Sequence, residues 1–201
     1  MNDFLFDEFD TFTPAAWKQK IQVDLKGEDY NESLIWKSNE GVHVKPFYTS
    51  EDRHYSNVPT AKDGYKICQS IFVDNVIIAN KLALDSIERG ATAIQFIANK
   101  KFNYKLLLDK IDIDKTSLYL KLEFLDATFV NDIHNYYNNS HIYFQIDIIG
   151  KLASSGNWHT NMNSDIAETK KFIHNSNNSI CVNASLYQNA GASIIQELAY
   201  A

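Results

Sequence analysis

The last stretch of the chain decides the fold: S-I-C-V-N-A-S-L-Y-Q-N-A-G-A-S-I-I-Q-E-L-A-Y-A, at Ser179–Ala201. It opens with a β-rich run at Ile180–Ser185, turns at Tyr187–Asn189 and continues into an apolar helix at Ala192–Ala201. A strand, a short turn and a helix form the repeating unit of a parallel α/β protein. The small side chains of residues 190–192 would let helix and strand pack closely. Since no cap or glycine ends the helix, we expect the sequence to be part of a longer protein.

The same unit repeats upstream from Tyr65. The clearest helix is Asn75–Arg89, for which Asp74 is the expected N-cap and Gly90 the expected end. Five strand–helix units in succession favour a parallel sheet, either a barrel or an open doubly wound sheet. The strands are expected at Lys66–Ile71, Thr92–Ile97, Ser117–Phe124, Ile142–Ile148 and Ile180–Ser185. The helices are expected at Asn75–Arg89, Tyr104–Ile111, Ala127–Tyr137, Ser164–Asn175 and Ala192–Ala201.

Apolar and polar side chains alternate along three of these strands. Strands of a parallel sheet that is covered on both faces should be apolar on both, so an apolar face and a polar face favour a barrel with a polar lumen. An antiparallel sheet with one wet face is the alternative, and the intervening helices disfavour it. We therefore predict an α/β fold, a partial (β/α)8 TIM-type barrel of about five βα units. The residues expected in its lumen are Tyr119, Lys121, Glu123, Tyr143, Gln145, Asp147, Asn183 and Ser185.

The first 64 residues differ in pattern and are predicted to form a separate region, followed by the barrel at 65–201. Residues 1–12 combine four phenylalanines with acidic residues, which suits an arm packing either on its own domain or on a partner. Thr13–Pro14 predicts the start of a helix that Gly27 ends. Short strands at Ser33–Ser38 and Val42–Lys45 predict a hairpin. We expect this region to contact another subunit.

Composition excludes several classes of function. The net charge of −6 argues against nucleic acid or an anionic membrane as partner. Cys68 and Cys181 lie in apolar strand-like runs and make no disulfide framework, which indicates buried thiols in a reducing compartment. The N-terminus lacks the apolar run of a signal peptide, and no apolar run is long enough for a membrane span. These features predict a cytoplasmic protein.

The sequence offers little catalytic chemistry of its own. It contains no glycine-rich phosphate loop, no nucleophile elbow and no metal-binding histidine spacing, so no metal is expected. Alternation brings together one cluster of polar groups, Lys121, Glu123, Gln145 and Asp147. Barrel enzymes place catalytic groups where strands end, as at Glu123 and Asp147. The alternative, which we favour, is that these groups neutralise one another in a filled lumen.

Two long motifs carry a resemblance to a known family. They are E-G-V-H-V-K-P-F-Y-T-S-E-D at Glu40–Asp52 and N-A-S-L-Y-Q-N-A-G-A-S-I-I-Q-E-L-A-Y-A at Asn183–Ala201. With looser matches at Pro14–Gly27 and Gly64–Ser70, the chain resembles the N-terminal half of a methylmalonyl-CoA mutase chain, most of all the small (β) subunit. That family isomerises methylmalonyl-CoA and succinyl-CoA with adenosylcobalamin, held between a (β/α)8 barrel and a cobalamin domain. The cofactor carries the radical chemistry, and the protein supplies burial and positioning.

The resemblance also implies that catalytic residues of the family are replaced in this chain. In the family's catalytic chain the segment S-G-Y-H-x-Q-E-A-G-A carries the histidine that binds the thioester carbonyl. Aligning Gln188–Ala192 on it puts Leu186 at that histidine, Ser185 at the tyrosine and Asn189 at the glutamate, so no catalytic residue is expected here. The tyrosine-bearing segment R-Q-Y-A-G-F also has no counterpart beyond Tyr65–Ile71.

The resemblance implies a non-catalytic small subunit that supports a catalytic large (α) subunit. Adenosylcobalamin is expected on that partner and not on this chain, and a CoA thioester is expected as the substrate of the complex. Tyr48 and Thr49 are the residues expected to contact CoA. The rival hypotheses are a self-sufficient acyl-CoA mutase or other barrel enzyme that uses Glu123 and Asp147, and a module that only binds CoA.

Overall fold

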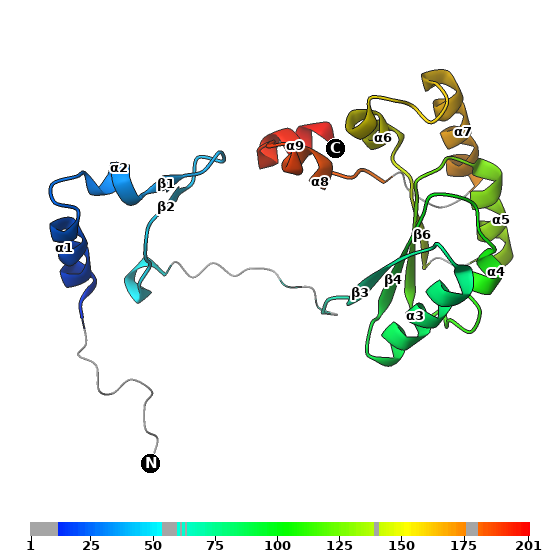
Figure 1. Cartoon of the computed structure of the whole chain (residues 1–201), viewed down its shortest axis with the longest axis horizontal. Coiled ribbons are helices and arrows are strands. Elements are labelled where there is room, and N and C mark those ends of the chain that lie inside the picture. Colours follow the sequence, from blue (N-terminus) through cyan, green and yellow to red (C-terminus); the bar gives the residue numbers. More distant parts are fainter. Residues whose placement is uncertain (1–11, 54–59, 61, 63, 139–140, 176–180) are drawn as a thin grey trace, which may run out of the picture. The chain divides into compact units, whose positions relative to one another are not determined.

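The computed structural model describes residues 12–53, 60, 62, 64–138, 141–175 and 181–201. The chain forms two compact units, one mainly from the residues before Thr60 and one mainly from Thr60 on. The larger unit is an α/β structure around a four-stranded parallel sheet (Figure 1). Its strands are β3 (Cys68–Phe72), β4 (Ala93–Ala98), β5 (Ser117–Leu122) and β6 (Ile142–Gln145), in the order β3-β4-β5-β6.

Helices join the consecutive strands and cover one side of the sheet. They are α3 (Val76–Glu88), α4 (Tyr104–Leu107) and α5 (Ala127–Tyr137), followed after β6 by α6 (Ile148–Ser155) and α7 (Met162–Asn175). Figure 1 shows α3, α4, α5 and α7 on the same side of the sheet. Strands in sequential order with helices on one side are compatible with an arc of a (β/α) barrel. The predicted α/β class is confirmed, and closure into a barrel stays a prediction.

The two faces of the sheet differ as the alternation predicts. Leu118, Leu120 and Leu122 of β5 are at most 4% exposed and belong to the core under the helices. Tyr119 and Lys121 point to the other face, where Tyr119 pairs in register with Gln95 of β4. This polar face is the one that would line a barrel lumen.

The predicted fifth strand, Ile180–Ser185, is wrong for its described residues, 181–185. Residues 181–183 have no regular structure, and Ser185–Asn189, which includes the predicted turn, forms the short helix α8. The backbone N–H of Asn183 donates to the Asp147 carboxylate (2.8 Å), and the Ser185 hydroxyl donates to the Asn183 side chain (2.7 Å). These side-chain bonds take the place of a strand ladder. The predicted last helix is present as α9 (Ile194–Tyr200).

The other differences lie at element ends. Strand β6 stops at Gln145, because Asp147 caps α6, a helix that the strand prediction through Ile148 overlooked. Strand β5 ends at Leu122, before Glu123. At α3 the cap is Asn75 and not Asp74: its side chain accepts from the N–H groups of residues 77 and 78.

The smaller unit begins with α1 (Pro14–Asp24), which starts as predicted, with Thr13 accepting a hydrogen bond from the N–H of Ala16 (3.2 Å). It continues with α2 (Tyr30–Leu34), the antiparallel pair β1 (Trp36–Lys37) and β2 (His43–Val44), and the 3-10 turn η1 (Ser50–Asp52). The predicted hairpin is thus confirmed in shorter form. Tyr30 is the one buried residue among those described in this unit. The unit therefore has hardly any core of its own.

Candidate functional site

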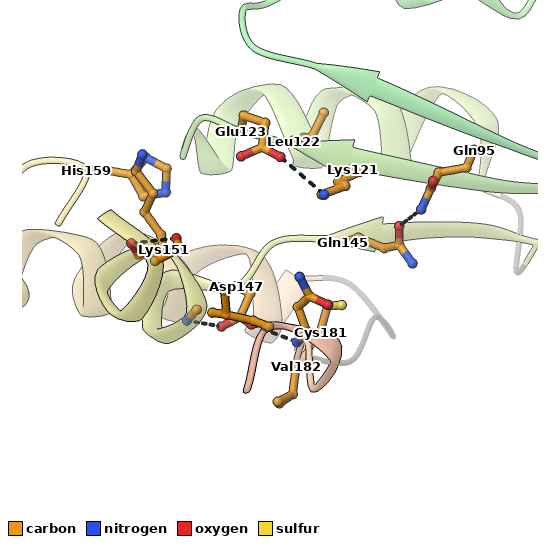
Figure 2. A pocket seen from close by; sticks show the side chains of 14 residues that line it. Gln95, Lys121, Leu122, Glu123, Gln145, Asp147, Lys151, His159, Cys181 and Val182 are labelled. Atoms are coloured by element: carbon orange, nitrogen blue, oxygen red, sulfur yellow. Dashed lines mark hydrogen bonds and ion pairs between the residues drawn. The ribbon is translucent and has the colours of Figure 1, made fainter. Parts of the chain in front are cut away.

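A pocket of the larger unit lies where β5 and β6 end. Its volume is about 470 Å3, within the range of sites that hold one small molecule. The ends of β5 and β6 form one wall, α6 and the loop after it a second, and the segment before α8 a third (Figure 2). The lining residues are Gln95, Lys121, Leu122, Glu123, Gln145, Asp147, Gly150, Lys151, Ser154, His159, Cys181, Val182, Asn183 and Leu186.

Asp147 holds two walls of this pocket together. One carboxylate oxygen accepts from the N–H of Gly150 (2.7 Å) and caps α6, while the other accepts from the N–H of Asn183 (2.8 Å). A Cβ on residue 150 would collide with that carboxylate, so the close approach requires glycine here. Because both oxygens of Asp147 accept backbone hydrogen bonds, this carboxylate ties segments together and is poorly placed to act as a general base.

The remaining polar groups at the strand ends also bond to one another. Lys121 lies 3.5 Å from Glu123 in an ion pair whose side chains are 41% and 46% exposed. The Gln95 amide donates to Gln145 (2.7 Å) and accepts from the Ser70 hydroxyl (2.8 Å), which links β3, β4 and β6 across the polar face. Of the four groups expected to neutralise one another, Lys121 and Glu123 form such a pair, whereas Gln145 bonds to Gln95 and Asp147 bonds to backbone N–H groups.

Outside the pocket, two stacked aromatic rings cover part of the polar face of the sheet. Tyr119 and Tyr143, which pair in register, stack with ring centroids 5.2 Å apart and planes at 20°. Burial, with smaller contributions from Tyr143 and Cys68, raises the pKa of the Tyr119 hydroxyl. Both rings therefore occupy space that a narrow ligand would need in an open lumen.

The structure brings together six of the residues singled out in the sequence: Lys121, Glu123, Gln145, Asp147, Asn183 and Leu186 all line the pocket. Tyr119 and Tyr143 lie on the polar face outside it, and Ser185 is tied to the side chain of Asn183. Tyr48 and Thr49 belong to the smaller unit, where they border a shallow hollow with Ser50, Asp52 and Arg53.

Among the lining residues that sequence reasoning missed, Lys151, Ser154 and His159 come from outside the expected strands. The backbone at His159 is held in place by Asp165, which is buried (1% exposed). The Asp165 carboxylate accepts hydrogen bonds from the backbone N–H groups of His159 (2.7 Å) and Thr160 (3.1 Å). Burial and the nearby Asp147 raise the pKa of the Cys181 thiol, and Lys121 acts in the opposite direction. No local pattern marks these residues, because they converge only through the course of α6 and the loops around it.

The described residues contain neither a candidate metal site nor a candidate membrane-spanning helix. No cluster of three or more His, Cys, Asp or Glu side chains there could hold a metal ion. Within the same described ranges, no helix is both long and apolar enough to cross a membrane.

Fold and pocket define the class: an α/β protein with a parallel sheet and a small polar pocket at the carboxyl ends of its strands. No family model matches the chain. A curated relative is the protein named "Methylmalonyl-CoA mutase small subunit" of Porphyromonas gingivalis, which is 34% identical over 110 residues. The match covers 48% of this chain and 18% of the relative. The resemblance to a mutase small subunit, stated above from two sequence motifs, is confirmed by this similarity.

Proposed function

We propose that this chain is part of the non-catalytic small subunit of an adenosylcobalamin-dependent methylmalonyl-CoA mutase. In this role it supports a catalytic large subunit that isomerises methylmalonyl-CoA and succinyl-CoA. The observation that carries the proposal is Leu186. It lines the pocket at the strand ends. The resemblance aligns it with the histidine that binds the thioester carbonyl in the catalytic chain of the family. A leucine side chain has no donor for a developing oxyanion.

The polar groups of the pocket support the same conclusion. A barrel enzyme using Glu123 and Asp147 needs at least one of them available to move a proton. Asp147 instead accepts two backbone hydrogen bonds, and Glu123 is paired with Lys121. The rival hypothesis of a barrel enzyme that uses Glu123 and Asp147 is therefore disfavoured.

The pocket does not fit the cofactor. At about 470 Å3 it matches one small molecule, and a corrinoid with its nucleotide loop is larger. We therefore assign no cobalamin contact to these residues, and under this proposal the cofactor is expected on the partner chain. The CoA contact expected of Tyr48 and Thr49 stays a prediction: the Tyr48 side chain is 58% exposed, but the Thr49 hydroxyl already contacts Asp52 (3.3 Å).

The smaller unit supports a role in subunit contact. Its described residues leave large apolar side chains in water, among them Trp17 (51% exposed), Trp36 (66%) and Val42 (56%). Short helices and a two-stranded hairpin are marginal in water without a face to pack on. A partner subunit that covers these side chains would supply such a face. The cytoplasmic location expected from the sequence belongs to the same proposal.

Complex formation tests this proposal. The protein that contains this chain is co-expressed with the large subunit of the mutase from the same organism, and the purified material is examined by size-exclusion chromatography with light scattering. A one-to-one complex is the expected result. Two subunits that elute separately at micromolar concentration would contradict the proposal.

A further inference from the structure

The pocket holds two basic side chains that the proposed function leaves without a role, Lys151 on α6 and His159 in the loop before α7. Both line the cavity and are half-buried. In the part of the chain that the structure describes, neither the Lys151 ammonium nor the His159 ring has a hydrogen-bond or ion-pair partner. Polar groups taken partly out of water normally have a partner, and a ligand can supply one.

The acidic groups that line the pocket do not form hydrogen bonds or ion pairs with the Lys151 and His159 side chains. Both oxygens of Asp147 accept backbone hydrogen bonds, and Glu123 is the partner of Lys121. Figure 2 shows Lys151 and His159 on one side of the pocket and the Gln95–Gln145 pair on the other. The basic groups without partners thus lie together at one wall.

The backbone of that wall is held in place by specific contacts. Lys151 lies on a helix with a side-chain cap at its start, Asp147, and a left-handed glycine at its end, Gly156 (φ 70°). The backbone of His159 is held by the buried carboxylate of Asp165. Ser154, which also lines the pocket, donates its hydroxyl to the backbone carbonyl of Lys151 (3.1 Å). An ammonium and an imidazole on fixed backbone are donors that bind oxyanions.

We infer that this pocket binds a small oxyanion, either inorganic phosphate or a carboxylate, at Lys151 and His159. The ligand completes the hydrogen bonds of the two basic side chains, and the apolar side chains of Leu186 and Val182 also line the pocket. The inference does not depend on the proposed function, because it concerns binding to this chain alone.

The test is a titration followed by backbone amide chemical shifts of the isotope-labelled chain. Phosphate and acetate are added in separate titrations, with acetamide as the uncharged match for acetate. We expect saturable shifts at residues 151, 154 and 159 with at least one of the two anions and none with acetamide. The anion whose addition produces saturable shifts shows whether the pocket prefers a phosphate or a carboxylate.

Two variants make the test specific. Lys151→Met keeps the length of the side chain and removes the charged donor, so the dissociation constant should rise at least about 10-fold. Lys170→Met removes an exposed lysine on α7, outside the pocket, and should leave it unchanged. His159→Gln keeps a donor and should weaken binding less than Lys151→Met. The amide spectrum of each variant confirms its fold. Absence of saturation with both anions, or equal affinity of Lys151→Met and the unmodified chain, would overturn the inference.

Discussion

The two units of this chain differ in what they bury. In the larger unit, Phe96, Leu118 and Ile133 are completely shielded from water. In the smaller one, Tyr30 is the one buried residue among those described, while Trp17 and Trp36 are more than half exposed. Apolar burial is the dominant stabilising contribution to folding. The larger unit therefore carries the stability of the chain, and the smaller unit depends on local caps. In the proposed function, a partner subunit covers the aromatic residues of the smaller unit.

The largest effect is expected in the core. Phe96→Ala removes a ring that is 0% exposed and should lower the free energy of unfolding by about 3–5 kcal/mol. Trp36→Ala is the matched control in the smaller unit, with an expected change within about 0.5 kcal/mol because the ring is 66% exposed. Urea unfolding followed by circular dichroism measures both. An equal decrease in the free energy of unfolding in the two variants would contradict the difference in burial between the two units.

The second effect concerns the link between α6 and the segment before α8. Gly150→Ala places a methyl group against the Asp147 carboxylate and should cost about 1–3 kcal/mol. Asp147→Ala loses the helix cap, at about 1 kcal/mol. The double variant should cost less than the sum, because the clash disappears with the carboxylate. Strict additivity in urea unfolding would show that the two residues do not interact.

The third effect tests the exposed aromatic residues of the smaller unit. Trp36→Ala should weaken the affinity for the large subunit by about 10-fold or more, since exposed tryptophans are enriched among interface hot spots. Leu106→Ala, which removes a 53% exposed side chain of the larger unit, serves as the control. Calorimetric titration with the large subunit measures both affinities. Unchanged affinity of Trp36→Ala would remove this residue from the interface.

The smallest effect is a pH dependence in the smaller unit. The hydrogen bond from Lys45 (2.6 Å), with support from the N–H of Thr49 (3.0 Å), lowers the pKa of Asp52. A carboxylate whose pKa is lower in the folded state stabilises it above the unfolded pKa of about 3.9, and this contribution is lost as the pH falls through the folded pKa. Carboxyl chemical shifts should show Asp52 titrating below an ordinary aspartate, and Lys45→Met should reduce the difference, because the Thr49 N–H still donates to Asp52. An unshifted Asp52 in the unmodified chain would contradict this ion pair.

The sheet could be predicted from the sequence because its signals are local. Alternation along Ser117–Leu122 assigned each side chain to the correct face, since the strand period of two is visible in the residues themselves. Thr13 and Pro14 fixed the start of α1 in the same way. These predictions need only neighbouring residues.

The candidate site could be predicted only in part, because distant contacts build it. The β-rich run at Ile180–Ser185 lost its expected strand to a hydrogen bond from Asn183 to a carboxylate 36 residues away. The alternating isoleucines before Ile148 concealed the capping function of Asp147. His159 reaches the pocket because Asp165, six residues later, is buried and holds its backbone.

Turnover is the most direct test of the central claim that this chain is a non-catalytic subunit. The full-length protein containing it is supplied with adenosylcobalamin and methylmalonyl-CoA, with and without the large subunit, and succinyl-CoA and the radical signal are measured. The account predicts neither product nor radical without the partner. In the unmodified chain the missing carbonyl donor alone costs about 100- to 1000-fold in rate. The account also predicts neither product nor radical for Leu186→His alone, because the tyrosine-bearing segment and the polar neighbours of the catalytic histidine are absent too. Succinyl-CoA formed by the unmodified protein without the large subunit would contradict the claim.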